Sequence, residues 1–141
     1  MWKNHLKLSK QYPKISLQEE RRLIAKAKKG SSKEADELVL RHTSFVIFRI
    51  NKRVFPSHLQ RFGDELFSES IFILYEKIKT YNLRYRDRDG NFKPVRFSSY
   101  IWKRVDGFIL DFLRKELCEE KGNFEKRVNV SNETEEKMEE G

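Results

Sequence analysis

Three observations on the sequence predict an all-α protein, folded as a bundle of about four helices. Apolar residues recur every three or four positions in four segments of the 141-residue chain. Each of these segments opens with a residue that favours a helix N-terminus, either Ser or Asp. The alternating pattern of a β-strand occurs only in short isolated runs such as 128–130. The eleven Phe residues supply large apolar side chains for a core, although only 38% of the residues are hydrophobic.

The first two helices are expected over residues 16–29 and 31–54. Each opens with the capping-box pattern Ser-x-x-Glu, the first at Ser16 and the second at Ser31. The first helix is expected to stop at Gly30, because glycine readily adopts the left-handed conformation that follows a helix end. The apolar stripe of the second helix includes His42, which is more often a satisfied core residue than a ligand in such a position.

The last two helices are expected over residues 64–81 and 98–117. Asp64 is expected to be the N-cap of the helix over 64–81. Between them, Asp89-Gly90 predicts a tight turn or a small hairpin. The predicted organisation is therefore an N-terminal arm (1–14), a helical domain (15–117) and an acidic tail (118–141). The tail is expected to be disordered, since it has few apolar residues with which to offset the entropy of ordering.

The charge of the chain, +8 in total, is unevenly distributed. Residues 1–33 contain ten basic and two acidic side chains, and residues 84–115 contain nine and four. Residues 116–141 reverse the balance, with four basic and nine acidic side chains. Two basic blocks of this kind are typical of a protein that binds a polyanion such as a nucleic acid. The alternative is a lysine-rich surface that is simply solvated.

The sequence contains no recognisable catalytic or metal-binding pattern. Its three histidines are scattered, its six glycines form no phosphate-binding loop, and Cys118 is its single cysteine. The sequence therefore predicts a protein that is not an enzyme and has no cofactor. A single cysteine, and the lack of an apolar run long enough for a signal peptide or a membrane span, favour a cytoplasmic location without membrane contact.

Cations and aromatic residues interleave in the loop 82–96 and continue into the last predicted helix. The loop places Tyr85 and Phe92 among five cations, and the helix opens with Tyr100 and Trp102. Cations hold phosphates, and exposed aromatic rings stack on unpaired bases, so the pattern favours single-stranded DNA. The alternative is that the aromatic rings belong to the core and that the cations only solvate the helix.

Two stretches, ELFSESIFILYEKIKTYN (65–82) and RFSSYIWKRVDGFILDFLRK (96–115), resemble region two of the sigma-70 family of RNA polymerase sigma factors. In that family a helix with the approximate sequence Asp-Leu-x-Gln-Glu precedes the motif Lys-Phe-Ser-Thr-Tyr. Residues 96–100 of this chain (RFSSY) match the second motif. The continuation is closest to alternative sigma factors of the flagellar and stress type. The resemblance covers about residues 13–115, because the segment 15–46 is similar to the entry helix and first core helix of the same module.

The resemblance implies a fold like that of sigma region two and a role in transcription initiation. It implies a surface that docks on the clamp helices of the largest subunit of core RNA polymerase, made by Glu65, Leu66, Ser68 and Glu69. It also implies that Tyr100 stacks on a flipped adenine of the minus-ten element, on the non-template strand of promoter DNA, and that the preceding loop captures another flipped base. The residues expected to bind DNA are Arg84, Arg86, Arg88, Lys93, Arg96, Phe97, Ser99, Tyr100, Trp102, Lys103, Arg104 and Arg114.

The sequence departs from the family in two ways that leave alternatives open. Lys103 and Arg104 replace the Trp-Trp wedge of primary sigma factors, so melting by aromatic wedging should be poorer. Nothing after Leu117 resembles a domain that reads the minus-thirty-five element. The chain is then a truncated factor, half of a split sigma factor whose second subunit supplies that domain, or a factor of a mobile element or phage. An anti-sigma factor is a further expected partner. The alternative function is a helical protein-interaction regulator without direct promoter binding.

Overall fold

The computed structural model describes the backbone of residues 13–128 and the side chains of residues 13–118. Five α-helices make up its regular structure, with no β-strand in the described part of the chain. The helices are α2 (Leu17–Lys28), α3 (Ser32–Arg41), α4 (Thr43–Arg53), α5 (Pro56–Thr80) and α6 (Phe97–Val128). The prediction of an all-α fold is confirmed, with one helix more than expected.

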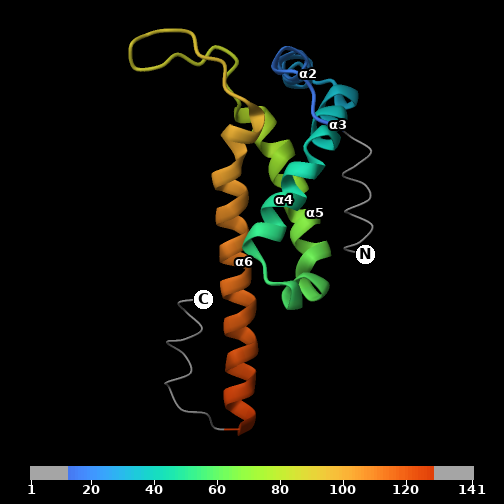
Figure 1. The fold of residues 1–141 in the computed structure, drawn as a ribbon, viewed down its shortest axis with the longest axis vertical. Helices are drawn as coiled ribbons and strands as arrows, with labels where there is room; N and C mark the ends of the chain where they lie inside the picture. The colour runs from blue at the N-terminus through green and yellow to red at the C-terminus, as the bar shows by residue number, and fades with distance from the viewer. Residues whose placement is uncertain (1–12, 129–141) are drawn as a thin grey trace.

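The longest helix, α6, forms one side of the molecule, and α4 and α5 pack along its first half (Figure 1). The shorter helices α2 and α3 pair with each other at the end of the bundle where α6 begins. The second half of α6 extends past the other helices (Figure 1). The first half of α6 is thus covered by α4 and α5 on one side and left accessible on the other.

A stripe of apolar residues at every fourth position fixes how α6 faces the bundle. The stripe consists of Phe97, Ile101, Val105, Ile109 and Leu113, all of which are buried. Spacing of four keeps these side chains on one face of a helix, where they meet the core residues of α4 and α5. Phe97 has no exposed surface and packs edge-on against the His42 ring at a centroid distance of 5.0 Å. Its assignment to the DNA face is therefore corrected: Phe97 is a core residue.

The second predicted helix is in fact two helices, α3 and α4, which meet at His42. His42 has φ −107° and ψ 6°, outside the helical range, and its amide donates to the Val39 carbonyl. The Thr43 hydroxyl donates to the Leu40 carbonyl, and a His42 ring nitrogen lies 2.8 Å from the Leu38 carbonyl oxygen. Side chains thus satisfy the last carbonyls of α3, so the chain can change direction without leaving buried groups unpaired.

Other predicted helix ends are partly confirmed. Ser16 caps α2 by accepting a hydrogen bond from the Glu19 amide, and Gly30 follows α2 with φ +105°. The hydroxyl of Ser31, by contrast, bonds to the Glu34 carboxylate and not to a backbone amide. The serine cap of the capping box is therefore confirmed at the start of α2, where the Glu19 carboxylate binds Arg22, and it is not formed at the start of α3.

The predicted start of α5 and end of α6 were both wrong. α5 begins at Pro56, which suits a first helical position, so Asp64 lies inside the helix and is not its N-cap. α6 continues past the expected end at Leu117 to Val128. The expected tail therefore begins within a helix, and residues 129–141 lie outside the described part of the chain.

We expect Phe97→Ala to lower the free energy of unfolding by about 3–5 kcal/mol, the range for removing a fully buried Phe ring. Urea denaturation followed by circular dichroism measures this change. Phe72→Ala, which removes an exposed ring from α5, should change stability by no more than about 0.5 kcal/mol. Equal stability of the two variants would contradict the core assignment of Phe97.

Candidate nucleic-acid interface

The loop 81–96 projects from the end of the bundle (Figure 1) and closes on a tight turn. The Asp87 carboxylate accepts hydrogen bonds from the amides of Asp89 and Asn91, and Gly90 has φ +81°. An isolated antiparallel bridge joins Arg86 to Phe92. The predicted turn at Asp89-Gly90 is confirmed, and it holds the tip of the loop in a defined conformation.

Arg21 of α2 attaches the base of this loop to the bundle. Its guanidinium donates to the Leu83 carbonyl oxygen at 2.6 Å and lies 5.2 Å from the centroid of the Phe92 ring. Tyr81 donates its hydroxyl hydrogen to the Val95 carbonyl, and burial raises the pKa of Tyr81. The loop cations that remain on the surface are Arg84, Arg86, Arg88 and Lys93. The base of the loop is therefore fixed, and these four cations are exposed along the loop.

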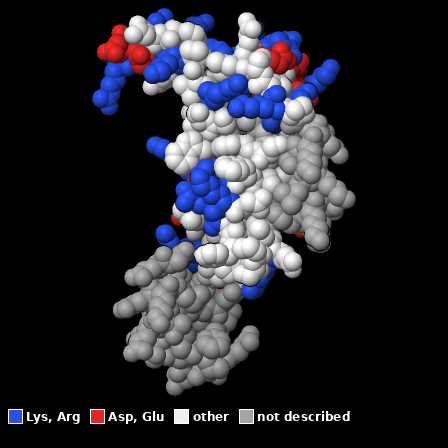
Figure 2. Space-filling model, in the orientation of Figure 1, with Lys and Arg blue, Asp and Glu red and all other residues white. Residues whose placement is uncertain are grey.

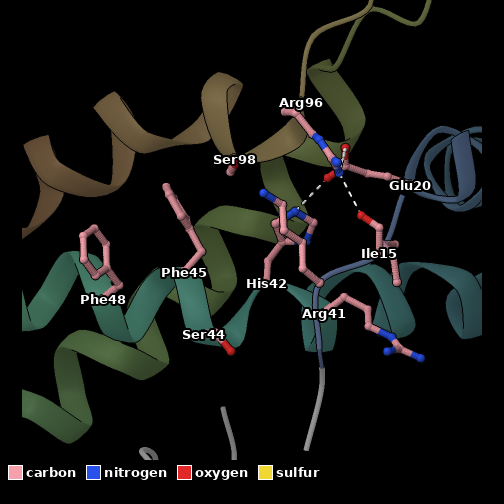
Figure 3. A pocket seen from close by; sticks show the side chains of 10 residues that line it. Ile15, Glu20, Arg41, His42, Ser44, Phe45, Phe48, Arg96 and Ser98 are labelled. Atoms are coloured by element: carbon pink, nitrogen blue, oxygen red, sulfur yellow. Dashed lines mark hydrogen bonds and ion pairs between the residues drawn. The ribbon is translucent and has the colours of Figure 1, made fainter. Parts of the chain in front are cut away.

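Arg96, also expected to bind DNA, is partly buried and makes contacts inside the protein. It donates to the Ile15 carbonyl oxygen at 2.9 Å and lies 3.7 Å from Glu20 Oε2 (Figure 3). Glu20 Oε1 in turn lies 2.9 Å from a ring nitrogen of His42. Both ring nitrogens of His42 thus have protein partners, which confirms the prediction that it is a satisfied core residue. Arg96 joins the segment before α2 to the segment before α6.

Sequence reasoning missed Glu20, because an acidic residue in the first turn of a helix is already explained by the helix dipole. The structure buries Glu20 almost completely, facing His42 and Arg96. A weak signal was available: Glu20 lies three and four residues before Leu23 and Ile24, on the buried stripe of α2. The two partners of its carboxylate, His42 and Arg96, lie 22 and 76 positions later in the chain and have no local signature.

A cavity of about 280 Å³ opens beside this ionic cluster, between α4 and the start of α6 (Figure 3). Its wall includes Ile15, His42, Phe45, Arg96 and Ser98. A shallower groove of about 410 Å³ shares Phe45 and Ser98 with it and is completed by Arg49, Lys52, Arg53, Ser99 and Trp102. The two depressions are therefore adjacent, and no acidic side chain lines the groove.

Tyr100 and Trp102 lie on opposite flanks of α6 and do not form one platform. The Tyr100 hydroxyl shares a hydrogen bond with Thr80 of α5, and its ring packs edge-on against Tyr81 at 5.3 Å. The ring of Trp102 lies 5.3 Å from the guanidinium of Arg49 on α4. Two residues along a helix differ by about 200° in direction, which is the physical reason for the separation.

The remaining residues expected to bind DNA are exposed, but they do not form one continuous site. Ser99, Lys103 and Arg104 lie on the surface in the first two turns of α6. Arg114 is also exposed, but it lies ten residues beyond Arg104, about 15 Å farther along the helix at 1.5 Å per residue. The compact part of the candidate interface is therefore the loop and the first two turns of α6.

Asp106 and two arginines, all missed by sequence reasoning, join α4 to α6. Arg49 binds both carboxylate oxygens of Asp106, with Nε at 2.8 Å from Oδ1, and Arg53 Nε lies 2.9 Å from Oδ2. Asp106 is only 4% exposed. Burial by itself raises the pKa of this carboxyl. The hydrogen bonds from Arg49 and Arg53 have a larger combined effect in the opposite direction, so the pKa of Asp106 is below its usual value. The bond to Asp106 also raises the pKa of Arg49.

Lys and Arg side chains gather in two places on the face seen in Figure 2. One group spreads over the end of the molecule that carries the loop and α2, and a compact group lies at mid-height, where α4 runs beside α6 in Figure 1. The few Asp and Glu side chains visible on this face lie mostly at the loop end. No helix within residues 13–128 is both long and apolar enough to span a membrane.

The residues expected to bind polymerase lie on α5, and one of the four is buried. Glu65, Ser68 and Glu69 are exposed on one face of the helix, whereas Leu66 is fully buried and packs in the core. The assignment of Leu66 to the docking surface is thus corrected. Phe72, which sequence reasoning missed, follows on the exposed face and is 64% exposed. Its spacing of seven from Glu65 was the signal that could have revealed it.

Comparison of the chain with family models, with curated proteins and with solved structures finds no match in any of the three.

We expect Asp106→Asn to lower the free energy of unfolding by about 2 kcal/mol at neutral pH, because charge-assisted hydrogen bonds to Arg49 and Arg53 are lost. A carboxyl whose pKa is lowered by folding stabilises the protein above its unfolded pKa of about 3.9 and loses that contribution as the pH falls through the folded value. The difference between wild type and variant should therefore shrink in acid.

Urea denaturation over this pH range measures the effect, with the exposed Asp111→Asn as the matched control. A constant difference at every pH would contradict an ionised Asp106 as its source.

Proposed function

We propose that this protein is a sigma-like transcription initiation factor, which binds core RNA polymerase and recognises the minus-ten promoter element as single-stranded DNA. The observation that carries the proposal is that the exposed members of the two sequence motifs form two surfaces on different helices. One is the acidic face of α5, and the other is the basic, aromatic start of α6 with its loop. A factor that binds a protein and DNA at the same time needs two separate surfaces of this kind.

The chemistry of the α6 surface suits an unpaired DNA strand. Removing a base from the duplex costs a few kcal/mol of stacking, and an aromatic ring outside the duplex offsets that cost. Tyr100 presents such a ring, held at its hydroxyl by Thr80 and with Lys77 Nζ 5.1 Å from its centroid. The groove of about 410 Å³ on the opposite flank of α6, beside Trp102, lies within the size range of ligand sites and is lined by Arg and Lys.

The α5 surface suits a protein partner. Glu65, Ser68 and Glu69 provide a polar, acidic rim next to the exposed ring of Phe72. An aromatic ring surrounded by polar groups is a common anchor of protein interfaces, and the carboxylates complement a basic partner. We assign this surface to the clamp helices of core polymerase, as the resemblance to sigma factors implies.

A helical protein-interaction regulator without promoter binding is the second candidate, and the exposed Phe72 favours it equally well. This candidate requires the acidic α5 surface but not the basic surface of α6. The two candidates differ in whether the protein binds single-stranded DNA in a salt-sensitive manner.

Tyr100→Ala should weaken binding to a single-stranded minus-ten oligonucleotide by at least about tenfold, because one base loses its stacking partner. Binding to core polymerase should not change, since Tyr100 lies outside the α5 surface. Fluorescence anisotropy with labelled oligonucleotide and a pull-down with core polymerase measure the two activities.

Tyr100→Phe is the matched control: it keeps the ring, loses the hydrogen bond to Thr80 and should retain most of the DNA affinity. Loss of both activities in Tyr100→Ala, or of neither, would contradict the assigned role.

Glu69→Lys should weaken binding to core polymerase by about tenfold or more, because it reverses a charge within the acidic α5 surface. Binding to single-stranded DNA should remain or increase slightly. The exposed Asp111→Lys makes the same charge change on α6 and should leave polymerase binding intact. Equal effects of the two variants in the pull-down would show that net charge, and not this surface, controls docking.

A further inference from the structure

One oxygen of the buried Glu20 carboxylate is left without a hydrogen bond beside a cavity. Glu20 is 1% exposed, and its Oε1 lies 2.9 Å from His42 Nε2. Its Oε2 accepts no hydrogen bond within the described part of the chain, and Arg96 Nη1 lies 3.7 Å from it. Glu20 lines the cavity of about 280 Å³ between α4 and the start of α6 (Figure 3). Because a buried carboxylate oxygen without a donor is costly, this atom indicates a ligand that supplies an N–H or O–H group.

The start of α6 brings positive charge to the same cavity. The Tyr100 amide makes the first hydrogen bond of α6, to the Arg96 carbonyl oxygen at 3.1 Å. The amides of residues 97–99 come before it, and the first amides of a helix have no acceptor within the helix. Ser98 of this turn lines the cavity together with the Arg96 guanidinium. A helix N-terminus and a guanidinium are both groups that bind a carboxylate.

Arg96 retains donors for such a contact. Its Nη1 donates to the Ile15 carbonyl oxygen at 2.9 Å, and a guanidinium has several further N–H groups. The bond to Ile15 holds the side chain in place, so less conformational entropy is lost when a ligand binds. Arg96 is thus preorganised next to Glu20.

Apolar side chains form another part of the cavity wall and limit the size of a ligand. Ile15 and Phe45 are half-buried there, and Phe48 is exposed at the opening. A cavity of about 280 Å³ has the volume of about nine water molecules in the liquid. Leucine and methionine have about this number of non-hydrogen atoms. The cavity therefore suits a small molecule with a short apolar chain.

The two charges on the wall select a ligand that carries both signs. An amine alone would bring a second cation against Arg96, and an anion alone would lie against Glu20. A molecule with an ammonium and a carboxylate places each of its charges beside the opposite charge. Because Glu20 Oε2 and Arg96 Nη1 are 3.7 Å apart, both groups of the ligand must be close together, as they are on one α-carbon.

We propose that this cavity binds a free α-amino acid whose apolar side chain is about the size of leucine. The ammonium donates to Glu20 Oε2, the carboxylate accepts from Arg96 and the first amides of α6, and the side chain packs on Ile15 and Phe45. The site lies outside the surfaces assigned to DNA bases and to polymerase, so the inference goes beyond the proposed function and does not depend on it.

L-leucine should bind the full chain at one saturable site with a dissociation constant of about 1 mM or tighter. The amide resonances of residues 97–99 in the isotope-labelled protein should shift during the titration, which locates the carboxylate. N-acetyl-leucine lacks the ammonium, 3-methylbutylamine lacks the carboxylate, and glycine lacks the apolar chain. Each should bind at least about tenfold more weakly than L-leucine. Absence of saturable leucine binding, or equal binding of the three analogues, would overturn the proposal.

Glu20→Gln keeps the shape of the side chain and removes its charge. It should weaken leucine binding by about tenfold or more, because the ammonium loses a charge-assisted hydrogen bond. Glu19→Gln is the matched control, since Glu19 precedes it on α2 and binds Arg22 at the surface. Equal affinities of the two variants in the same titration would contradict the assigned role of Glu20.

Ser98→Leu tests the cavity without touching the Glu20 cluster, in case Glu20→Gln is too unstable to compare. The larger side chain should fill part of the cavity and abolish leucine binding, while circular dichroism shows the helical fold retained. Ser57→Leu makes the same change at the matching position of α5, the second residue of the helix, where Ser57 is exposed. Leucine binding that survives in Ser98→Leu as it does in Ser57→Leu would place the ligand elsewhere and overturn the proposal.

Discussion

The positions of the candidate DNA-binding residues on α6 depend on the apolar stripe of that helix. Its members, which start at Phe97 and recur at every fourth residue, press one face of α6 against α4 and α5. Once that face is fixed, Tyr100 must point toward the end of α5 and Trp102 toward α4. The stripe therefore divides the two aromatic side chains between two flanks of one helix, which is how one short segment contributes to two parts of the surface.

Two buried ionic clusters add orientation to this apolar packing. Asp106 joins α4 to α6 through Arg49 and Arg53. Glu20 joins α2 to the junction of α3 and α4 through His42, and to the segment before α6 through Arg96. Buried ion pairs contribute little net stability, because desolvation cancels much of their attraction, but breaking one is costly. Their effect here is geometric: they fix the sides of the cavity and the groove beside Phe45.

The sequence predicted local features well where the physical cause is local. The Ser16 cap, the positive φ of Gly30 and the turn at Gly90 each follow from residues a few positions apart, and all three are present. The break at His42 was not predicted, because the periodicity of apolar residues continues through it and the compensating hydrogen bonds come from side chains. The early start of α5 was not predicted, because a proline such as Pro56 can follow the end of one helix as readily as it opens the next.

By itself the sequence determined which side chains are available: a basic, aromatic segment, an acidic stripe on one helix and helical periodicity throughout. Only the tertiary structure decided which of them reach the surface. It placed Phe97 and Leu66 in the core, directed Arg96 inward to Ile15 and Glu20, and brought Arg49 of α4 beside Trp102 of α6. The physical reason is that burial and ion pairing depend on partners tens of residues away, such as Arg49 and Asp106, whereas helical periodicity depends only on near neighbours.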